Sequence, residues 1–240
     1  MTTLFISDLH LDPDAPEITA QFIGFLEGEA HRAEALYILG DLFEVWLGDD
    51  DPEPSNASVK AALRRLTAAG VPCHLMHGNR DFLIGADFCR DTGCRLLQDG
   101  ATVNLYGEPV LLMHGDVLCT DDVGYQRLRR IVRNPLVQGI FRRLSLTRRQ
   151  SLAARLRAGS REHIMSTAPE IMDVNATAVA EAFHRSGVRT LVHGHTHRPA
   201  VHEVSLPNRT ARRVVLGDWH TQGSVLEWNP GGFALRSLPR

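Results

Sequence analysis

The sequence lacks the features of a membrane-spanning or exported protein. No apolar run approaches the roughly 18 residues that a membrane-spanning helix needs, and the N-terminus has neither a charged region nor a long apolar stretch. We therefore expect no secretory signal and a cytoplasmic protein. The cysteines lack the C-x₂-C spacing of a structural zinc site, so we expect free thiols in a reducing compartment. They are Cys73, Cys89, Cys94 and Cys119.

One long segment contains no acidic residue. Residues 123–161 include eleven arginines and no Asp or Glu. Because the whole chain has a net charge of −2, removing these eleven positive charges leaves −13 for the remainder. Such a basic segment indicates an anionic partner. It has few aromatic residues (Tyr125, Phe141) and no recognisable nucleic-acid-binding motif, which argues against RNA or DNA.

The hydrophobic pattern predicts strands and helices that alternate in the first half of the chain, with turn-linked strands later. Short apolar runs predict strands at 3–7, 35–39, 71–76, 103–106, 109–113, 190–192, 213–216, 225–228 and 233–235. Helical spacing predicts helices at 17–30, 59–69, 82–92, around 128–132, 135–144, 150–156 and 176–184. A chain of 240 residues can bury one substantial core. We expect a layered α/β fold with mixed sheets and a site at the strand ends.

Polar clusters follow five of these predicted strands. They are Asp8-x-His10, Gly40-Asp41, Gly78-Asn79-Arg80-Asp81, His114-Gly115-Asp116 and Gly194-His195-x-His197. A single Asp or His at a strand end is most often a cap or a core residue, but five such clusters are hard to explain by structure alone. Their oxygen and nitrogen atoms suit manganese, iron or zinc. Seven candidate ligands are too many for one tetrahedral ion and suit two ions that share a carboxylate.

The five ordered motifs resemble those of the calcineurin-like metallophosphoesterases across nearly the whole chain. The resemblance implies a two-sheet β-sandwich flanked by helices, in one domain spanning 1–240, with a helical cap insertion at about 123–170. By resemblance, one metal ion would be held by Asp8, His10, Asp41 and His197. The other would be held by Asp41, Asn79, His114 and His195, so that Asp41 bridges. The catalytic residues implied are Asp41, Arg80, His114 and His195.

Arg80 departs from the superfamily, most members of which have a histidine after Gly-Asn. That histidine often protonates the leaving oxygen, which a permanently charged arginine cannot do. The leaving group should therefore need no proton. A phosphate monoester released from a pyrophosphate fits, because its relevant pKa is about 6. Arg80 would then bind phosphate oxygens and stabilise the transition state.

Gly78-Asn79-Arg80-Asp81-Phe82, together with the arginine-rich segment, narrows the resemblance to the UDP-2,3-diacylglucosamine pyrophosphohydrolases of lipid A biosynthesis. That family splits its lipid-linked nucleotide sugar into UMP and 2,3-diacylglucosamine 1-phosphate, by water attack on the uridine-side phosphorus. The resemblance implies two Mn²⁺ ions per chain, with iron or zinc as alternatives. It also implies a monomer bound peripherally to the cytoplasmic face of the inner membrane.

The basic segment would supply part of the substrate site. Its apolar stripes could line a groove for two acyl chains, although a plain amphipathic cap is the simpler interpretation. Tyr125 is a weaker candidate, as a ring beside the glucosamine. The substrate contacts carried over from the family are Asn79, Arg80, Asp122, Ser160, Ile164, Thr167 and His195.

Two other functions stay open at this point. The chain could be a different phosphoesterase, such as a cyclic nucleotide phosphodiesterase or another nucleoside diphosphate hydrolase, although Arg80 and the basic segment argue against both. It could also be a metal-free scaffold on the same fold. A scaffold should have degraded ligands, whereas all seven candidates are intact here.

Overall fold

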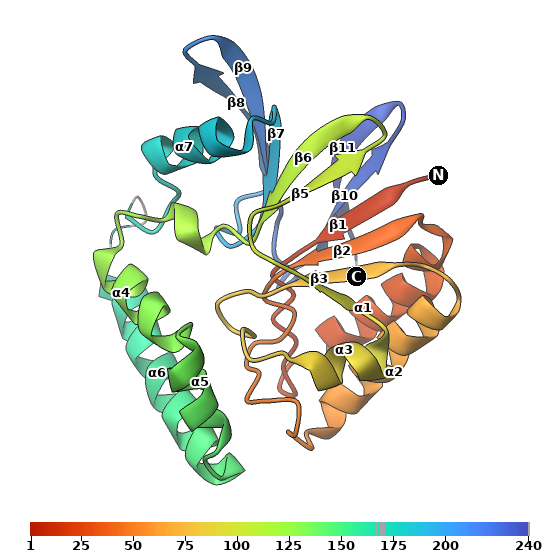
Figure 1. Cartoon of the computed structure of the whole chain (residues 1–240). Helices are drawn as coiled ribbons and strands as arrows, with labels where there is room; N and C mark the ends of the chain where they lie inside the picture. Colours follow the sequence, from red (N-terminus) through yellow and green to blue (C-terminus); the bar gives the residue numbers. More distant parts are fainter. Residues whose placement is uncertain (167, 169–170, 240) are drawn as a thin grey trace.

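Two mixed β-sheets form the centre of the fold in a computed structural model, which describes residues 1–166, 168 and 171–239 (Figure 1). The six-stranded sheet has the order β11-β10-β1-β2-β3-β4, and the five-stranded sheet has the order β5-β6-β7-β9-β8. The first contains β1 (Thr3–Ile6), β2 (Ala35–Leu39), β3 (Cys73–Met76), β4 (Arg95–Leu97), β10 (Gly223–Asn229) and β11 (Gly232–Leu238). The second contains β5 (Ala101–Leu105), β6 (Glu108–Met113), β7 (Thr190–His193), β8 (Ala200–Leu206) and β9 (Arg209–Val215).

Helices cover the outer faces of both sheets. The six-stranded sheet carries α1 (Pro16–Gly28), α2 (Pro54–Ala68) and α3 (Ala86–Thr92), and α7 (Ala176–Ser186) lies against the other sheet (Figure 1). Short 3₁₀ turns occur at η1 (Ala30–Arg32) and η2 (Asp116–Leu118). This arrangement confirms the predicted two-sheet fold flanked by helices.

Strand β1 shows why the sequences of the buried strands are continuous apolar runs. Leu4 and Ile6 pack into the cluster that includes α1 and α2, whereas Phe5 faces the cluster between the two sheets. Successive side chains of a strand point to opposite faces, so a strand covered on both sides needs apolar residues throughout. The parallel pairing of β1 with β2 and of β2 with β3 brings their C-terminal ends to one edge.

The basic segment folds into three helices at one side of the sheets (Figure 1). They are α4 (Val123–Val132), α5 (Pro135–Arg142) and α6 (Leu146–Ser166), together called the three-helix unit below. The Asn134 side chain caps α5 by accepting a hydrogen bond from Leu136 N, with Pro135 in the first turn. In the part of the chain that the structure describes, no helix is long and apolar enough to cross a membrane.

Several predicted boundaries differ from the structure. Helix α6 is far longer than the predicted 150–156, and α2 begins at Pro54. Glu53 caps α2 by accepting a hydrogen bond from Ser55 N. Strands β4 and β8 were not predicted, because β4 is short and β8 is largely exposed and shows little apolar alternation.

Candidate metal centre and adjoining groove

The seven candidate metal ligands converge at the C-terminal ends of the strands. The loops after β1 and β2 are joined by backbone hydrogen bonds from Asp8 N to Gly40 O, at 3.1 Å, and from His10 N to Asp41 O, at 3.0 Å. The backbone of His195 also binds the Asp8 carboxylate, through a hydrogen bond of 2.9 Å to Oδ2. These contacts fix loops from distant parts of the sequence around one point.

One group of candidate ligands consists of Asp8, His10, Asp41 and His197. The Nε2 atoms of His10 and His197 lie 3.3 Å apart. His197 Nε2 lies 3.5 Å from Asp8 Oδ1, and His10 Nε2 lies 3.8 Å from Asp41 Oδ2. Asp8, His10 and Asp41 can each offer an atom within 4.8 Å of the others, which is compatible with one ion.

The second group consists of Asp41, Asn79, His114 and His195. Asn79 Oδ1 lies 2.9 Å from His114 Nε2 and 2.9 Å from His195 Nδ1. Asp41 Oδ2 is 3.8 Å from His114 Nε2, the same distance as from His10 Nε2 in the first group. Asp41 therefore lies between the two groups, as a bridging ligand would.

The backbone of this centre is unusual. Asp8, His10, Asp41, His195 and His197 all have positive φ values, between 51° and 70°. Left-handed backbone at a non-glycine residue costs of order 1–3 kcal/mol and persists where the surroundings fix it, often at functional sites. The strain therefore coincides with five of the seven candidate ligands.

Two glycines allow this close packing. A Cβ atom on Gly78 would lie 2.0 Å from Asp41 Oδ1, and one on Gly194 would lie 2.2 Å from Asp8 Oδ2. Neither position can hold a side chain without moving a candidate ligand.

The centre concentrates negative charge around buried imidazoles. Burial alone would lower the pKa of His114, but the carboxylates of Asp41, Asp116 and Asp8 raise it to about 9. Burial, with the nearby charge of His114, lowers the pKa of His195 to about 3, which keeps that ring neutral and able to ligate. The site therefore favours positive charge at its centre.

These residues fit a bound cation on structural grounds. Asp8 is fully buried, and its Oδ1 atom has no hydrogen-bond partner among the described residues. A buried carboxylate oxygen without a hydrogen bond is costly unless it faces a cation. With histidine nitrogens at 3.3 Å from one another, the donor set is that of a divalent transition metal.

Sequence patterns missed three residues that support these ligands. Glu44 Oε2 accepts a hydrogen bond from His10 Nδ1 at 3.0 Å, and Asp218 Oδ2 lies 3.4 Å from His197 Nδ1. The ring of His220 stacks on that of His10, with centroids 5.4 Å apart. None of the three belongs to a strand-end motif, although an Asp-x-His pair at Asp218 and His220 was a signal that could have been noticed.

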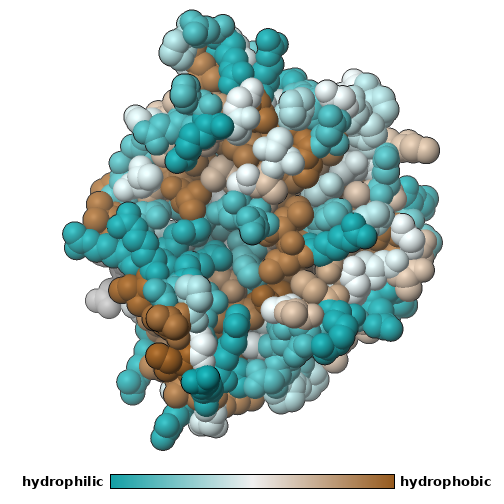
Figure 2. All heavy atoms as spheres, in the orientation of Figure 1, coloured by the Kyte–Doolittle hydropathy of each residue, from teal (hydrophilic) through white to brown (hydrophobic). Residues whose placement is uncertain are grey.

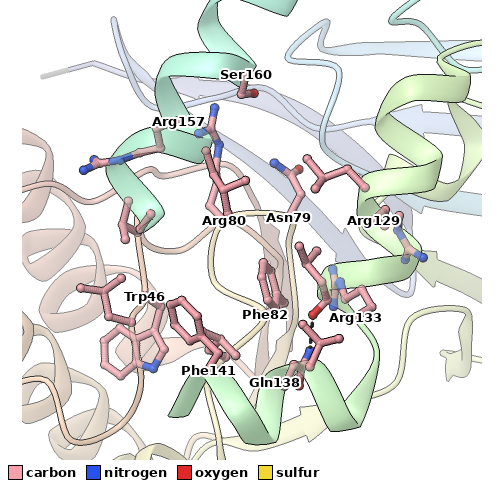
Figure 3. A pocket seen from close by; sticks show the side chains of 18 of the residues that line it. Trp46, Asn79, Arg80, Phe82, Arg129, Arg133, Gln138, Phe141, Arg157 and Ser160 are labelled. Carbon is pink, nitrogen blue, oxygen red and sulfur yellow. Dashed lines mark hydrogen bonds between the residues drawn. The ribbon is translucent and has the colours of Figure 1, made fainter. Parts of the chain in front are cut away.

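An apolar groove adjoins the centre, between the loops after β2 and β3 and the three-helix unit (Figure 3). The space between its walls, open solvent included, is about 1030 Å³. Four of its polar residues, Asn79, Arg80, Arg157 and Ser160, lie in the upper part of the view in Figure 3, whereas Arg129, Arg133 and Gln138 lie lower down. Its apolar lining includes Trp46, Leu47, Phe82, Leu83, Leu128, Val132, Val137, Phe141 and Leu156.

The groove brings together four of the predicted substrate contacts, namely Asn79, Arg80, Tyr125 and Ser160. Tyr125 donates a hydrogen bond to Asp116 Oδ2 at 2.8 Å, and its ring centroid lies 6.0 Å from that of His195. Burial, followed by the charge of Asp116, strongly raises the pKa of the Tyr125 hydroxyl, so it remains a proton donor.

Of the remaining predicted contacts, His195 belongs to the metal centre. Asp122 is buried at the N-terminus of α4, where it accepts a hydrogen bond from Tyr125 N at 2.9 Å, and it does not line the groove. Thr167 and the side chain of Ile164 lie outside the described residues. Arg157 was not predicted, yet it lines the groove, and its buried Nε atom has no hydrogen-bond partner among the described residues.

Comparisons with known proteins agree with this fold and site. A family profile described as calcineurin-like phosphoesterase matches residues 1–199. A solved archaeal phosphodiesterase covers 99% of the chain with a TM-score of 0.50 and 11% identity, a likeness of fold alone. The chain therefore belongs to the calcineurin-like phosphoesterases, and it is a hydrolase of that family.

Similarity to curated proteins identifies a narrower family for this chain. A UDP-2,3-diacylglucosamine hydrolase of Pseudomonas paraeruginosa is 53% identical over 239 residues, with full coverage of both chains. A protein of the same name from Escherichia coli O81 is 54% identical over 239 residues, again with full coverage of both. This chain is a member of the same family as those relatives.

Proposed function

We propose that this chain hydrolyses the pyrophosphate bond of UDP-2,3-diacylglucosamine in lipid A biosynthesis. The products would be UMP and 2,3-diacylglucosamine 1-phosphate, formed by attack of water on the uridine-side phosphorus. The observation that carries the proposal is that Asn79 belongs both to the metal centre and to the lining of the apolar groove. A substrate with a charged diphosphate and long apolar chains matches this juxtaposition.

The metal centre would hold two Mn²⁺ ions, one on each group of ligands, with Asp41 shared. Iron or zinc could fill the same positions, because the donors are oxygen and nitrogen atoms. Divalent ions in such a pair lower the pKa of water and neutralise charge on phosphoryl oxygens. The protein's own contribution is to place Arg80 beside the centre, where its backbone N donates to Asp41 Oδ1 at 2.8 Å.

Arg80 and Arg157 would bind the diphosphate in the part of the groove where Asn79 and Ser160 also lie. Both are permanent cations, and they lie next to each other although Arg80 follows β3 and Arg157 belongs to α6 (Figure 3). Neither supplies a proton to the leaving group. This fits a leaving phosphate monoester, which departs as an anion.

The three-helix unit would bind the acyl chains and the membrane. Hydrophobic residues gather over it at the lower left of the face in Figure 2. In the three-helix unit, Ile131, Leu136 and Ile140 have exposed fractions of 59%, 78% and 64%. Exposed apolar side chains beside arginines are typical of a surface that binds anionic lipids. The protein would act as a monomer at the cytoplasmic face of the inner membrane.

A manganese-dependent assay in ¹⁸O-labelled water tests the proposal. The purified chain should release UMP from UDP-2,3-diacylglucosamine, and the label should appear in UMP. Cyclic AMP and ADP-ribose, offered in parallel, should be poor substrates. Release of no UMP, or a label in the lipid phosphate, would contradict the proposed reaction. Metal analysis of the purified protein by mass spectrometry would test the metal-free alternative.

A further inference from the structure

We infer that Arg149 is a positioning residue that fixes the three-helix unit to the wall of the groove and so sets its width. Arg149 belongs to α6, and only 3% of its side chain is exposed. Its Nη1 atom donates to Leu47 O at 2.8 Å and to Asp50 Oδ1 at 2.7 Å. Its Nη2 atom donates to Asp50 Oδ2, so the carboxylate is bound by both prongs of the guanidinium.

The other side of this contact is a short loop that forms part of the groove. Trp46 and Leu47 line the groove, so the carbonyl that Arg149 binds belongs to a lining residue. Asp49, in the same loop, accepts hydrogen bonds from Gly85 N and Phe88 N at the start of α3, each at 3.0 Å. Asp49 thus holds the loop to the core, while Asp50 holds it to α6.

A second attachment lies at the opposite side of the groove. Arg129 of α4 donates to Asp116 Oδ2 at 2.6 Å, and Arg133 donates to Gly78 O at 2.8 Å. The three-helix unit is therefore attached through Arg149 as well as through Arg129 and Arg133, and in Figure 3 Trp46, next to the Leu47 that Arg149 binds, lies across the groove from Arg129 and Arg133. Removing the Arg149 contacts alone should therefore widen the groove, because the contacts of Arg129 and Arg133 near the metal centre stay in place.

Gly48 shows how closely the loop is fitted to Arg149. Its φ is +141°, and a Cβ atom there would lie 2.5 Å from Arg149 Nη1 and 2.6 Å from Asp50 Oδ1. A side chain at this position would therefore displace the ion pair without removing either charged partner. Gly48→Ala is an independent way to disturb the same contact.

The functional consequence rests on the proposed function. Arg149 lies behind the groove lining, and its guanidinium binds Leu47 and Asp50, neither of which is a candidate metal ligand. If the groove binds acyl chains, losing Arg149 should weaken the binding of long-chain substrate and leave the chemistry at the metal centre intact. The expected effect is on KM rather than on kcat.

The experiment compares Arg149→Ala with Arg148→Ala, whose arginine is exposed on the adjacent position of the same helix. We expect Arg149→Ala to raise KM for long-chain UDP-diacylglucosamine about tenfold and to raise it less for a short-chain analogue. Manganese-dependent hydrolysis of bis(p-nitrophenyl) phosphate, which has no acyl chain, should stay at the wild-type rate. Arg148→Ala should match the wild type in every assay. Arg149→Lys, which keeps the charge but has a single donor nitrogen, should be intermediate.

Hydrogen exchange gives a test that does not depend on the substrate. Backbone amides of residues 46–51 should exchange faster in Arg149→Ala than in the wild type, and Gly48→Ala should reproduce this if the first variant does not fold. If folded Arg149→Ala had the same ratio of KM for long-chain substrate to KM for the short-chain analogue as the wild type, the inference would be overturned. If the wild type itself released no UMP, the proposed function would fail, while the exchange result would still decide whether Arg149 holds the loop.

Discussion

Glu44 orients His10 through a hydrogen bond of 3.0 Å between Glu44 Oε2 and His10 Nδ1. The other carboxylate oxygen of Glu44 lies 3.5 Å from Arg80 Nη1. One side chain therefore contacts a candidate metal ligand and the cation assigned to the diphosphate. Carboxylates that bind the second nitrogen of a ligating histidine fix its orientation and raise its basicity.

Replacing Glu44 by Ala should weaken manganese binding by roughly 10- to 100-fold, the usual cost of losing such a partner. Glu44→Gln should bind metal more tightly than Glu44→Ala, because the amide oxygen still accepts from His10. Isothermal titration with MnCl₂ measures both. Glu17, which is exposed on α1, provides the matched control as Glu17→Ala. Equal affinity in wild type and Glu44→Ala would contradict this role.

The convergence of the candidate ligands was predictable from sequence because each motif follows its own buried strand. Asp8 comes two residues after β1, and Asp41 comes two residues after β2. The parallel order of the sheet then brings these strand ends together. Glu44 gave no such signal, because its partner His10 lies 34 residues away in the sequence.

The other features that the sequence did not predict depend on contacts between segments that are far apart in the chain. Arg149 and Asp50 are 99 residues apart, and nothing local distinguishes Arg149 from the exposed arginines around it. The full length of α6 was missed because only part of it has clear apolar spacing. The groove depends on how the three-helix unit docks, which no local pattern determines.

Asp41→Ala should abolish activity, because the residue is placed to contribute to both groups of ligands. The variant should also bind fewer manganese ions per chain, as measured by metal analysis after dialysis. Chelation of the wild-type protein with EDTA should cause a comparable loss of activity, and added Mn²⁺ should restore activity to the wild type alone. Substantial activity of the variant would contradict a bridging role.

Arg80→Ala should cost about 2–4 kcal/mol of transition-state stabilisation, or roughly 30- to 1000-fold in kcat. Arg80→Lys should recover part of this loss, since lysine keeps the charge but loses the two-pronged geometry. Steady-state kinetics with UDP-2,3-diacylglucosamine measures the difference, with Arg95→Ala, at an exposed position on β4, as the control. A near-wild-type kcat in Arg80→Ala would rule out the assigned role.

The pairing of Asp50 with Arg149 should weaken in acid. The hydrogen bond from Arg149 lowers the pKa of Asp50 below its ordinary value of 3.8. A carboxyl group whose pKa is lower in the folded state stabilises the fold above its unfolded pKa, and this contribution is lost as the pH falls through the folded value. The difference in free energy of unfolding between wild type and Asp50→Asn should therefore shrink below about pH 4. Urea titrations between pH 6 and pH 3 would measure it, and a constant difference would argue against the ion pair.

Membrane binding by the three-helix unit should combine apolar and electrostatic terms. Ile131, Leu136 and Ile140 are exposed, and Arg142 and Arg143 lie at the end of α5 beside them. Salt screens the attraction between exposed arginines and anionic headgroups but has little effect on the burial of apolar side chains. The two contributions can therefore be separated by their dependence on ionic strength.

Replacing Arg142 and Arg143 by Glu should reduce binding to vesicles of phosphatidylethanolamine and phosphatidylglycerol, with a larger loss in 20 mM than in 500 mM NaCl. Leu136→Ser with Ile140→Ser should reduce binding to a similar extent at both salt concentrations, because the lost term is apolar. Val201→Ser removes an apolar side chain that is 48% exposed on β8, away from this surface, and should bind like the wild type. Vesicle flotation measures all three variants. If the arginine variant bound as the wild type does at low salt, membrane contact would have to lie on another face of the molecule.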